Sequence, residues 1–335
     1  MDYSGIKVLV TGADGFIGSH LVEALLRQGA DVTALCLYNS FDTYGWLDDL
    51  QPSMCSGLKR VRGDIRDAAF VRRHVAGHEI VFHLAALIAI PHSYAAPQSF
   101  VDTNILGTLN VLEACRECSV ERLVQTSTSE VYGSAITLPI NESHPLQGQS
   151  PYSASKIGAD MMAEAFSRSF GLPVAILRPF NTFGPRQSER AVIGSTIRQI
   201  LDPACDALKL GSLDTVRDFT FVEDTARAFL AIGSAPAVKF GSPYNAGSGK
   251  AVTVGELVEL LCDITDCRKP IVLESSRLRP AESEVMALLA DSSRLAADAQ
   301  WEPRIGLREG LARTVGWWKE RLARGKVRRE ASVMT

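Results

Sequence analysis

The sequence contains no run of apolar residues long enough to cross a lipid bilayer. A transmembrane helix needs about 18 or more consecutive apolar residues. The best candidate, residues 80–90 (IVFHLAALIAI), is shorter and includes His83. The amino terminus also lacks a basic leader followed by an apolar stretch and a small-residue cleavage site. We therefore expect a soluble, cytoplasmic protein with no membrane partner.

The sequence also lacks a strong charge bias and a disulfide framework. Its formal net charge is only −3, so nothing in the charge balance indicates binding to nucleic acid. The seven cysteines are odd in number and follow no secretion signal, which favours free thiols. Cys115 and Cys118 form a C-x-x-C inside a helical pattern with no second pair beside it. Since this pair also has no histidine beside it and no histidine pair stands at ligand spacing, we predict no metal site.

Strands and helices alternate through the first half of the chain. We expect strands at residues 6–12, 31–37, 58–64, 80–86, 120–129 and 173–179, and helices at residues 16–29, 100–118 and 151–171. Strands joined by such helices predict an α/β fold, a Rossmann-type doubly wound parallel sheet. After residue 178 the segments become shorter and richer in glycine and proline, which indicates a smaller C-terminal lobe interleaved with the sheet. The predicted units are a nucleotide-binding domain (1–178), a substrate lobe (179–322) and a disordered basic tail (323–335).

A glycine-rich turn follows the first predicted strand. Residues 10–18 read VTGADGFIG and place Gly12, Gly15 and Gly18 between a strand and a helix. In dinucleotide-binding proteins such glycines permit the tight turn, the close approach of the pyrophosphate and the packing of the helix on the strand. The helix amino terminus, with Phe16 and Ile17 in its first turn, supplies unpaired N–H groups for the phosphates. We therefore predict a bound dinucleotide.

The second predicted strand does not reveal which dinucleotide is bound. A carboxylate that holds the ribose usually ends this strand, but Cys36 and Leu37 stand there. No arginine follows in the loop to receive a 2′-phosphate, which favours NAD and leaves NADP possible. Asp64, after the third strand, is either a partner of the adenine amino group or a simple strand-end cap. The remaining residues that we expect to contact the cofactor are Ile65, Leu84, Ala85, Ala86, Thr126, Tyr152 and Lys156.

Tyr152 and Lys156 are spaced to act together. They lie four residues apart on a predicted helix, so their side chains share one face. A free tyrosine has a pKa of about 10, and a nearby ammonium lowers that pKa by favouring the phenolate. Tyr152 is then suited to remove a hydroxyl proton while hydride leaves the same carbon.

Five motifs, in this order along the chain, resemble the extended short-chain dehydrogenase/reductase family. They are TGADGFIG (11–18), HLAA (83–86), NILGTLNVLEA (104–114), YSASK (152–156) and RPFNTFGPR (178–186), and the resemblance covers roughly residues 5–322. It implies a nucleotide-sugar substrate held by the C-terminal lobe and a homodimer formed through helices near residues 100–118 and 152–170. The residues that it suggests near the nucleotide or its diphosphate are Asn181, Arg186, Arg217 and Arg279.

The stretch TSTSE (126–130) resembles the T-S-E or T-D-E of nucleotide-sugar 4,6-dehydratases. The resemblance implies that Thr128 donates a hydrogen bond to the C4 oxygen of the sugar and that Glu130 removes the C5 proton. Ser129, Glu130 or a water would then protonate the leaving C6 hydroxyl. Longer local similarity, in residues 38–50, 83–94 and 145–160, points to dehydratases acting on nucleotide-linked N-acetylglucosamine, with UDP or GDP as the nucleotide.

Three alternatives remain open at this point. UDP-glucuronate decarboxylases resemble the same T-S-E stretch, although their β-keto acid loses CO₂ and needs no C5 deprotonation. A 4-epimerase needs only oxidation at C4, rotation and reduction. A binding protein that holds NAD without turnover is disfavoured because Glu130, Tyr152 and Lys156 are all present.

Overall fold

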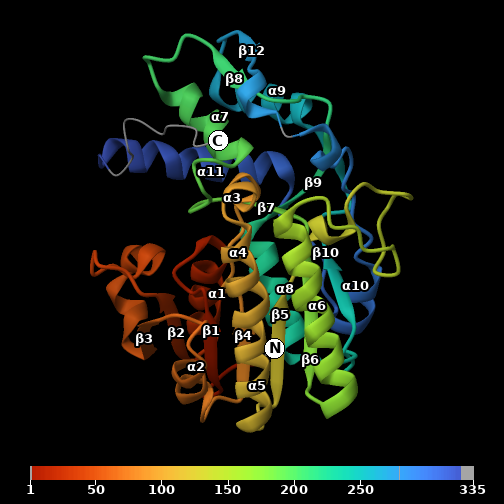
Figure 1. Cartoon of the computed structure of the whole chain (residues 1–335). Helices are drawn as coiled ribbons and strands as arrows, with labels where there is room; N and C mark the ends of the chain where they lie inside the picture. The colour runs from red at the N-terminus through yellow and green to blue at the C-terminus, as the bar shows by residue number, and fades with distance from the viewer. Residues whose placement is uncertain (1, 279, 326–335) are drawn as a thin grey trace.

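The structure is a computed structural model, and it describes residues 2–278 and 280–325 (Figure 1). Arg279, one of the predicted substrate contacts, lies outside the described residues. So do residues 326–335 of the predicted basic tail.

A seven-stranded parallel sheet forms the larger part of the molecule. Its strand order is β10-β6-β5-β4-β1-β2-β3. The bounds are β1 Lys7–Thr11, β2 Asp31–Leu37, β3 Leu58–Gly63, β4 Ile80–His83, β5 Arg122–Thr126, β6 Val174–Pro179 and β10 Pro243–Ala246. Every neighbouring pair in the sheet is parallel. The predicted Rossmann-type doubly wound fold is therefore confirmed.

Helices cover both faces of this sheet. Helices α1 (Phe16–Arg27) and α8 (Val222–Ser234) pack on one face, together with Val8 and Val10 of β1. On the other face, Leu9 of β1 packs with three helices. These are α2 (Ala68–Val75), α5 (Gly107–Glu117) and α6 (Pro151–Phe170). Successive strand residues point to opposite faces, so a strand covered on both sides has an unbroken apolar centre, as Val8, Leu9 and Val10 of β1 show.

The capping residues of α6 fix the position of its first turn. The Ser150 hydroxyl accepts the Ser153 N–H, and the Ser153 hydroxyl accepts the Ser150 N–H, so a capping box begins the helix. Pro151 occupies the first helical position, where its missing N–H costs nothing. Gly171 ends the helix in the left-handed conformation at φ 68°. The predicted range 151–171 thus agrees with the observed one to within a residue.

The helix predicted at residues 100–118 is not a single α-helix. A short helix α4 (Pro97–Phe100) leads into a wide π-helical turn (Val101–Leu106), and α5 follows. Asn104 is buried in this turn, where it bonds Leu87 N and O at 2.8 and 2.9 Å and the Ser155 hydroxyl at 2.9 Å. Such wide turns often occur at functional sites. Here the turn links α6 to the segment after β4, contacts that helical spacing alone does not predict.

The smaller lobe lies above the sheet in Figure 1. It holds two small sheets, ordered β11-β9-β7 and β12-β8. Their bounds are β7 Asn181–Phe183, β8 Leu208–Leu210, β9 Val216–Phe221, β11 Ala251–Thr253 and β12 Ile271–Leu273, and the lobe's helices are α7 Val192–Leu201, α9 Val254–Thr265 and α11 Leu307–Ala323. The chain enters this lobe after β6, returns to the main sheet for α8 and β10, and then enters it again.

The remaining helical elements are short. They are α3 Ile90–Ala95, α10 Ser293–Ala299 and 3₁₀ turns at Gly45–Asp49, Pro52–Gly57, Ser129–Tyr132, Ser275–Arg277 and Ala281–Ser283. All seven cysteines carry free thiols, as predicted. Within residues 2–278 and 280–325, no helix has both the length and the apolar character that a membrane span requires.

Candidate active site

The glycine loop forms a tight cradle at the carboxyl end of β1. Gly12 has a φ of +66°, and a Cβ added there would lie 2.7 Å from the Ala85 amide nitrogen. A Cβ on Gly18 would lie 2.1 Å from the Gly12 carbonyl oxygen, so α1 can approach the strand only with glycine at that position. A Cβ on Gly15 would meet only the Gly12 oxygen at 3.2 Å, and Gly15 is exposed. This open side is where a phosphate can approach the backbone.

The amino terminus of α1 faces the same space. Gly15 is its N-cap and has no side chain to accept the first N–H groups, so these donors are left for an anion. The side chains of Phe16 and Ile17 pack instead against the core of the smaller lobe. The residues present therefore fit the pyrophosphate of a dinucleotide, with Phe16 and Ile17 contributing through their backbone.

A buried hydrogen-bond chain fixes the segment that faces the glycine loop. The Thr11 hydroxyl accepts the N–H groups of Leu84 and Ala85, both at 3.2 Å, so its own proton goes to Nδ1 of His83 at 2.7 Å. His83 then carries its proton on Nε2 and donates to the Thr108 hydroxyl at 3.2 Å. Burial, with the Lys156 charge as a smaller cause, lowers the pKa of His83 to about 3. The neutral imidazole thus ties β1, β4 and α5 together and holds the predicted contacts Leu84 to Ala86 beside the loop.

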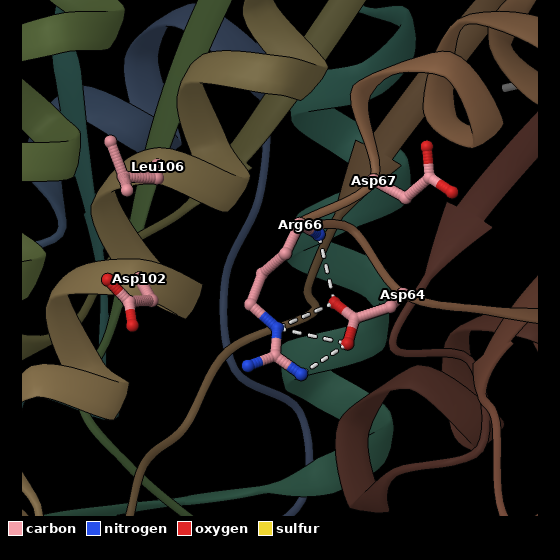
Figure 2. Close-up of a pocket in the computed structure, with 5 residues that line it drawn as sticks. All are labelled: Asp64, Arg66, Asp67, Asp102 and Leu106. Atoms are coloured by element: carbon pink, nitrogen blue, oxygen red, sulfur yellow. Dashed lines mark hydrogen bonds and ion pairs between the residues drawn. The ribbon is translucent and has the colours of Figure 1, made fainter.

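Figure 2 shows the cavity beyond β3 where the adenine was predicted. It has a volume of about 440 Å³ and is lined by Asp64, Arg66, Asp67, Asp102 and Leu106. Both oxygens of Asp64 accept hydrogen bonds from Nε of Arg66, at 3.0 and 2.9 Å, and these bonds hold the pKa of Asp64 below its usual value. Asp64 also accepts the Arg66 N–H, as a strand-end cap does. An adenine amino group would therefore have to share this carboxylate with Arg66.

The backbone next to Asp64 is already engaged. The carbonyl of Ile65 accepts a hydrogen bond from Nδ2 of Asn110 at 2.9 Å. The buried side chain of Ile65 packs against Gly107. A contact between Ile65 and the cofactor stays a prediction.

The predicted acid–base residues meet where β5 ends and α6 begins. Strand β5 stops at Thr126, and Thr128 caps a short turn by accepting the Glu130 N–H at 3.2 Å. The Thr128 hydroxyl and the Glu130 charge both act on the Tyr152 phenol: the hydroxyl lowers its pKa and the charge raises it. Lys156 donates from Nζ to the Thr126 carbonyl at 2.6 Å. The structure thus places Thr128, Glu130, Tyr152 and Lys156 around the end of β5, with Ser129 buried in the same turn. Their catalytic roles stay predictions.

The pKa of Tyr152 differs from the sequence-based expectation. Burial raises this pKa, the Thr128 hydrogen bond lowers it, and the charges of Glu130 and Asp160 raise it further. The predicted lowering by Lys156 is wrong for the protein alone, because desolvation outweighs the favourable contacts of the phenolate. Burial also lowers the pKa of Lys156 to about 8, opposed by the Asp160 charge. Burial therefore favours the neutral forms of both the Tyr152 phenol and the Lys156 amine.

The sequence prediction missed four residues that support this site. Asn104 holds the segment after β4, and Ser127, Asp160 and Arg178 form a buried hydrogen-bonded cluster. One signal was present: Asp160 follows Lys156 by four residues, which extends the Tyr152–Lys156 face by another turn. Arg178, in the otherwise apolar β6, was a second.

The predicted substrate residues do not form one group. Oδ1 of Asn181 is buried and has no hydrogen-bond partner within the described part of the chain. This oxygen can therefore accept a hydrogen bond from a donor group of a ligand. Arg217 is buried and donates to Oε1 of Glu284 at 3.1 Å. Arg186 is turned toward α1, where it donates to Glu23 at 3.0 Å and to the Ser19 hydroxyl at 3.3 Å. This geometry does not support Arg186 as a substrate contact, since its guanidinium already pairs with a carboxylate.

Known proteins resemble this chain over almost its full length. A dTDP-glucose 4,6-dehydratase of an Actinoplanes species is 33% identical over 320 residues, which cover 94% of this chain and 98% of that protein. The crystal structure of a dTDP-glucose 4,6-dehydratase from Streptomyces venezuelae, with NAD bound, superposes with a TM-score of 0.85. It is 32% identical, and the match covers 95% of this chain and 98% of that one.

An epimerase structure matches equally well. The UDP-N-acetylglucosamine 4-epimerase from Methanobrevibacter ruminantium, in complex with UDP-N-acetylmuramic acid, has a TM-score of 0.86 at 30% identity. That match covers 95% of this chain and 99% of the other. These relatives are dehydratases and an epimerase of nucleotide sugars, so similarity alone does not separate the two reactions.

The family comparison gives the same result. The model described as GDP-mannose 4,6 dehydratase matches residues 9–314, which include the glycine loop, the Thr128–Glu130 turn and Tyr152. The resemblance to extended short-chain dehydrogenases/reductases is thereby confirmed, and the chain belongs to the GDP-mannose 4,6-dehydratase family of nucleotide-sugar enzymes.

Proposed function

We propose that the protein is an NAD-dependent 4,6-dehydratase that acts on UDP- or GDP-N-acetylglucosamine. The observation that carries this proposal is the position of Glu130, in a turn capped by Thr128 and close enough to act on the Tyr152 phenol. An epimerase needs one acid–base group, at the C4 hydroxyl. A dehydratase needs a second group for the C5 proton, and Glu130 supplies a carboxylate for that step.

The cofactor site supports NAD. Gly12, Gly15 and Gly18 shape the cradle, and the first turn of α1 offers its N–H groups to the pyrophosphate. The Thr126 hydroxyl, buried and without a partner in the described residues, faces the same catalytic end of β5. When bound, NAD accepts hydride from C4 of the sugar and returns it to C6.

The side chains then divide the proton transfers among themselves. Tyr152 takes the proton of the C4 hydroxyl, and Thr128 donates a hydrogen bond at the same oxygen. Lys156, held by the Thr126 carbonyl, places its positive charge near the phenolate. The resulting C4 ketone acidifies the C5 proton, which Glu130 removes. The C6 hydroxyl leaves as water after taking a proton from Ser129, Glu130 or a bound water.

One apolar feature beside Tyr152 supports an N-acetylated hexose. Ile90 and Phe100 form a small apolar cluster with Tyr152, and Leu87 packs against it. An acetyl methyl group close to the tyrosine would find apolar contacts there. On the nucleotide side, the buried Oδ1 of Asn181 offers an acceptor. Arg217 would have to share its guanidinium between Glu284, to which it donates at 3.1 Å, and the diphosphate. Arg279 stays a proposed substrate contact on the sequence resemblance alone.

A panel of four nucleotide sugars tests the proposal. The purified protein is incubated with UDP- and GDP-N-acetylglucosamine, dTDP-glucose and UDP-glucuronate, and the products are identified by mass spectrometry and by the alkaline absorbance of 4-keto sugars. We expect a 4-keto-6-deoxy product from an N-acetylglucosamine nucleotide with no net accumulation of NADH. Release of CO₂ from UDP-glucuronate, or formation of a C4 epimer alone, would contradict the dehydratase proposal.

Two variants separate the individual steps. Glu130→Gln should still transfer hydride to the cofactor, but dehydration should slow by about 10²–10⁴-fold, the usual contribution of one general base. Tyr152→Phe should block the first oxidation itself. Dehydration by Glu130→Gln at the rate of the unchanged protein would show that Glu130 is not the base.

We also propose that the protein forms a homodimer through the π-helical turn, α5 and α6. Val101 and Leu106 lie on the turn and Met161 and Phe170 on α6. These four side chains are between 41% and 52% exposed and offer apolar surface to a second copy of the chain. Light scattering after size-exclusion chromatography would give the mass directly. A monomeric mass at micromolar concentration would refute this interface.

A further inference from the structure

A buried ion pair lies behind the catalytic residues. Asp160 of α6 and Arg178 of β6 have side-chain exposures of 0% and 2%. Oδ2 of Asp160 accepts from Nε and Nη2 of Arg178 at 3.1 and 3.0 Å. Taking two charges out of water is costly and is recovered only with good geometry and further hydrogen bonds. A pair at this depth therefore calls for an explanation beyond stability.

Two further contacts connect this pair to the segment that carries the acid–base residues. The Ser127 hydroxyl donates to Oδ2 of Asp160 at 2.7 Å. Nη1 of Arg178 donates to the Tyr132 hydroxyl at 3.0 Å, and that hydroxyl donates to Oδ1 of Asn245 at 2.7 Å. Ser127 comes directly before Thr128, and Tyr132 ends the turn that holds Glu130. The ion pair thus binds both ends of the short segment that presents Thr128 and Glu130.

We propose that Asp160 is a positioning residue: with Arg178 it clamps both ends of segment 127–132 and so fixes Thr128 and Glu130 against Tyr152 and Lys156 on α6. This inference builds on the proposed function, although oxidation at C4 is common to dehydratases, decarboxylases and epimerases. The face of α6 repeats every four residues, so Tyr152, Lys156 and Asp160 follow one another along it. One helix thereby carries the base, the ammonium and the anchor of the facing segment.

The charge of Asp160 adds an effect that packing alone would not produce. The charged or titratable groups around it are Arg178 of β6, Tyr132 of the turn, and Tyr152, Lys156 and Glu164 of its own helix. Asp160 raises the pKa of Lys156, which burial has lowered to about 8. Removing the carboxylate should therefore lower the pKa of Lys156 further, and the ammonium should lose its proton at a lower pH.

The first test is Asp160→Asn. Its kcat is measured against pH on UDP-N-acetylglucosamine, or on whichever sugar of the four-member panel the unchanged protein turns over. We expect kcat to fall by at least tenfold, because a displacement of about 1 Å costs up to about 100-fold. We also expect the basic limb of the pH profile to move to lower pH, because Lys156 loses the charge that raises its pKa. Glu164→Gln, four residues further along the helix, is the matched control and should leave the limb in place. A lower plateau with an unmoved basic limb would overturn the proposal.

A second pair of variants decides the matter if Asp160→Asn does not fold. Ser127→Ala and Tyr132→Phe each remove one hydroxyl from one end of the clamped segment. Each should lower kcat about tenfold while the KM and the affinity for NAD stay unchanged. Tyr3→Phe is the control, since the buried Tyr3 hydroxyl also donates one hydrogen bond, to the Leu230 carbonyl at 2.8 Å, on the other face of the sheet. Wild-type kcat in both test variants would refute the clamp.

Failure of the clamp is distinguishable from failure of the proposed function. The sugar panel shows which product the unchanged protein makes, whereas the clamp predicts how its variants differ from it on the same sugar. A protein that proves to be an epimerase would remove Glu130 from the mechanism. The shift of the basic limb predicted for Asp160→Asn would still be tested, because an epimerase also oxidises C4 and its kcat can be measured against pH.

Discussion

Replacing Thr11 by valine should reveal how much the chain from Thr11 to His83 contributes to the cofactor site. The substitution keeps the shape of the side chain and removes one hydroxyl. Leu84 N–H keeps a second acceptor, the Thr11 carbonyl at 3.2 Å, but Ala85 N–H and Nδ1 of His83 lose their partners. A buried polar group left without a partner costs about 1–3 kcal/mol. Nδ1 of His83 is buried and carries this cost, whereas the bond to Ala85 N–H is part-buried and contributes about 0.5–1.5 kcal/mol. The predicted loss in the free energy of unfolding is therefore about 1.5–4.5 kcal/mol.

The measurement is urea unfolding at neutral pH, combined with calorimetric titration of NAD. His83 stays neutral there, because its pKa is about 3, so the loss should be the same across the neutral range. Thr33→Val is the matched control. Its hydroxyl bonds Nε2 of the part-buried His78 at 2.8 Å, and loss of one such bond costs only about 0.5–1.5 kcal/mol. Affinity for NAD should fall in Thr11→Val alone. Equal destabilisation by the two variants would refute the assigned roles of the Thr11 hydroxyl.

Two further predictions concern glycines. Gly18→Ala should lose NAD binding and unfold more easily, because the new Cβ would lie 2.1 Å from the Gly12 carbonyl oxygen. Gly15→Ala should keep its stability and show only weaker NAD binding in calorimetry, and equal stability of the two variants would contradict this reasoning. On α11, Gly316→Ala meets nothing within 4 Å and should stabilise the protein by up to about 1 kcal/mol in urea unfolding. Gly310→Ala would place its Cβ 2.7 Å from the Phe183 ring and should destabilise it by about 1–3 kcal/mol, and a gain in stability there would show that the core can repack.

Local sequence pattern determined the elements near each motif. Alternating apolar strands and helical spacing predicted the sheet, and the observed β1, β2 and β6 fall within a residue or two of the predicted ranges. The capping residues Ser150 and Gly171 limited α6 in the same way. The prediction was less accurate at residues 100–118, where the π-helical turn interrupts the helix, and at residues 120–129, where the strand stops at Thr126. Asn104 bonds the backbone of Leu87, and Thr128 accepts the Glu130 N–H, so each side chain holds a local conformation that residue spacing does not predict.

The amino-acid sequence by itself determined that a glycine cradle, a tyrosine–lysine face and a hydroxyl-rich strand end occur together, because each is a short-range pattern. Only the tertiary structure decided how their charges and contacts balance. Burial raises the pKa of Tyr152 against expectation, Arg186 pairs with Glu23, and the Asp160–Arg178 pair ties α6 to the turn of Glu130. These outcomes depend on desolvation and on contacts between residues far apart in the chain, and local spacing carries no information about either.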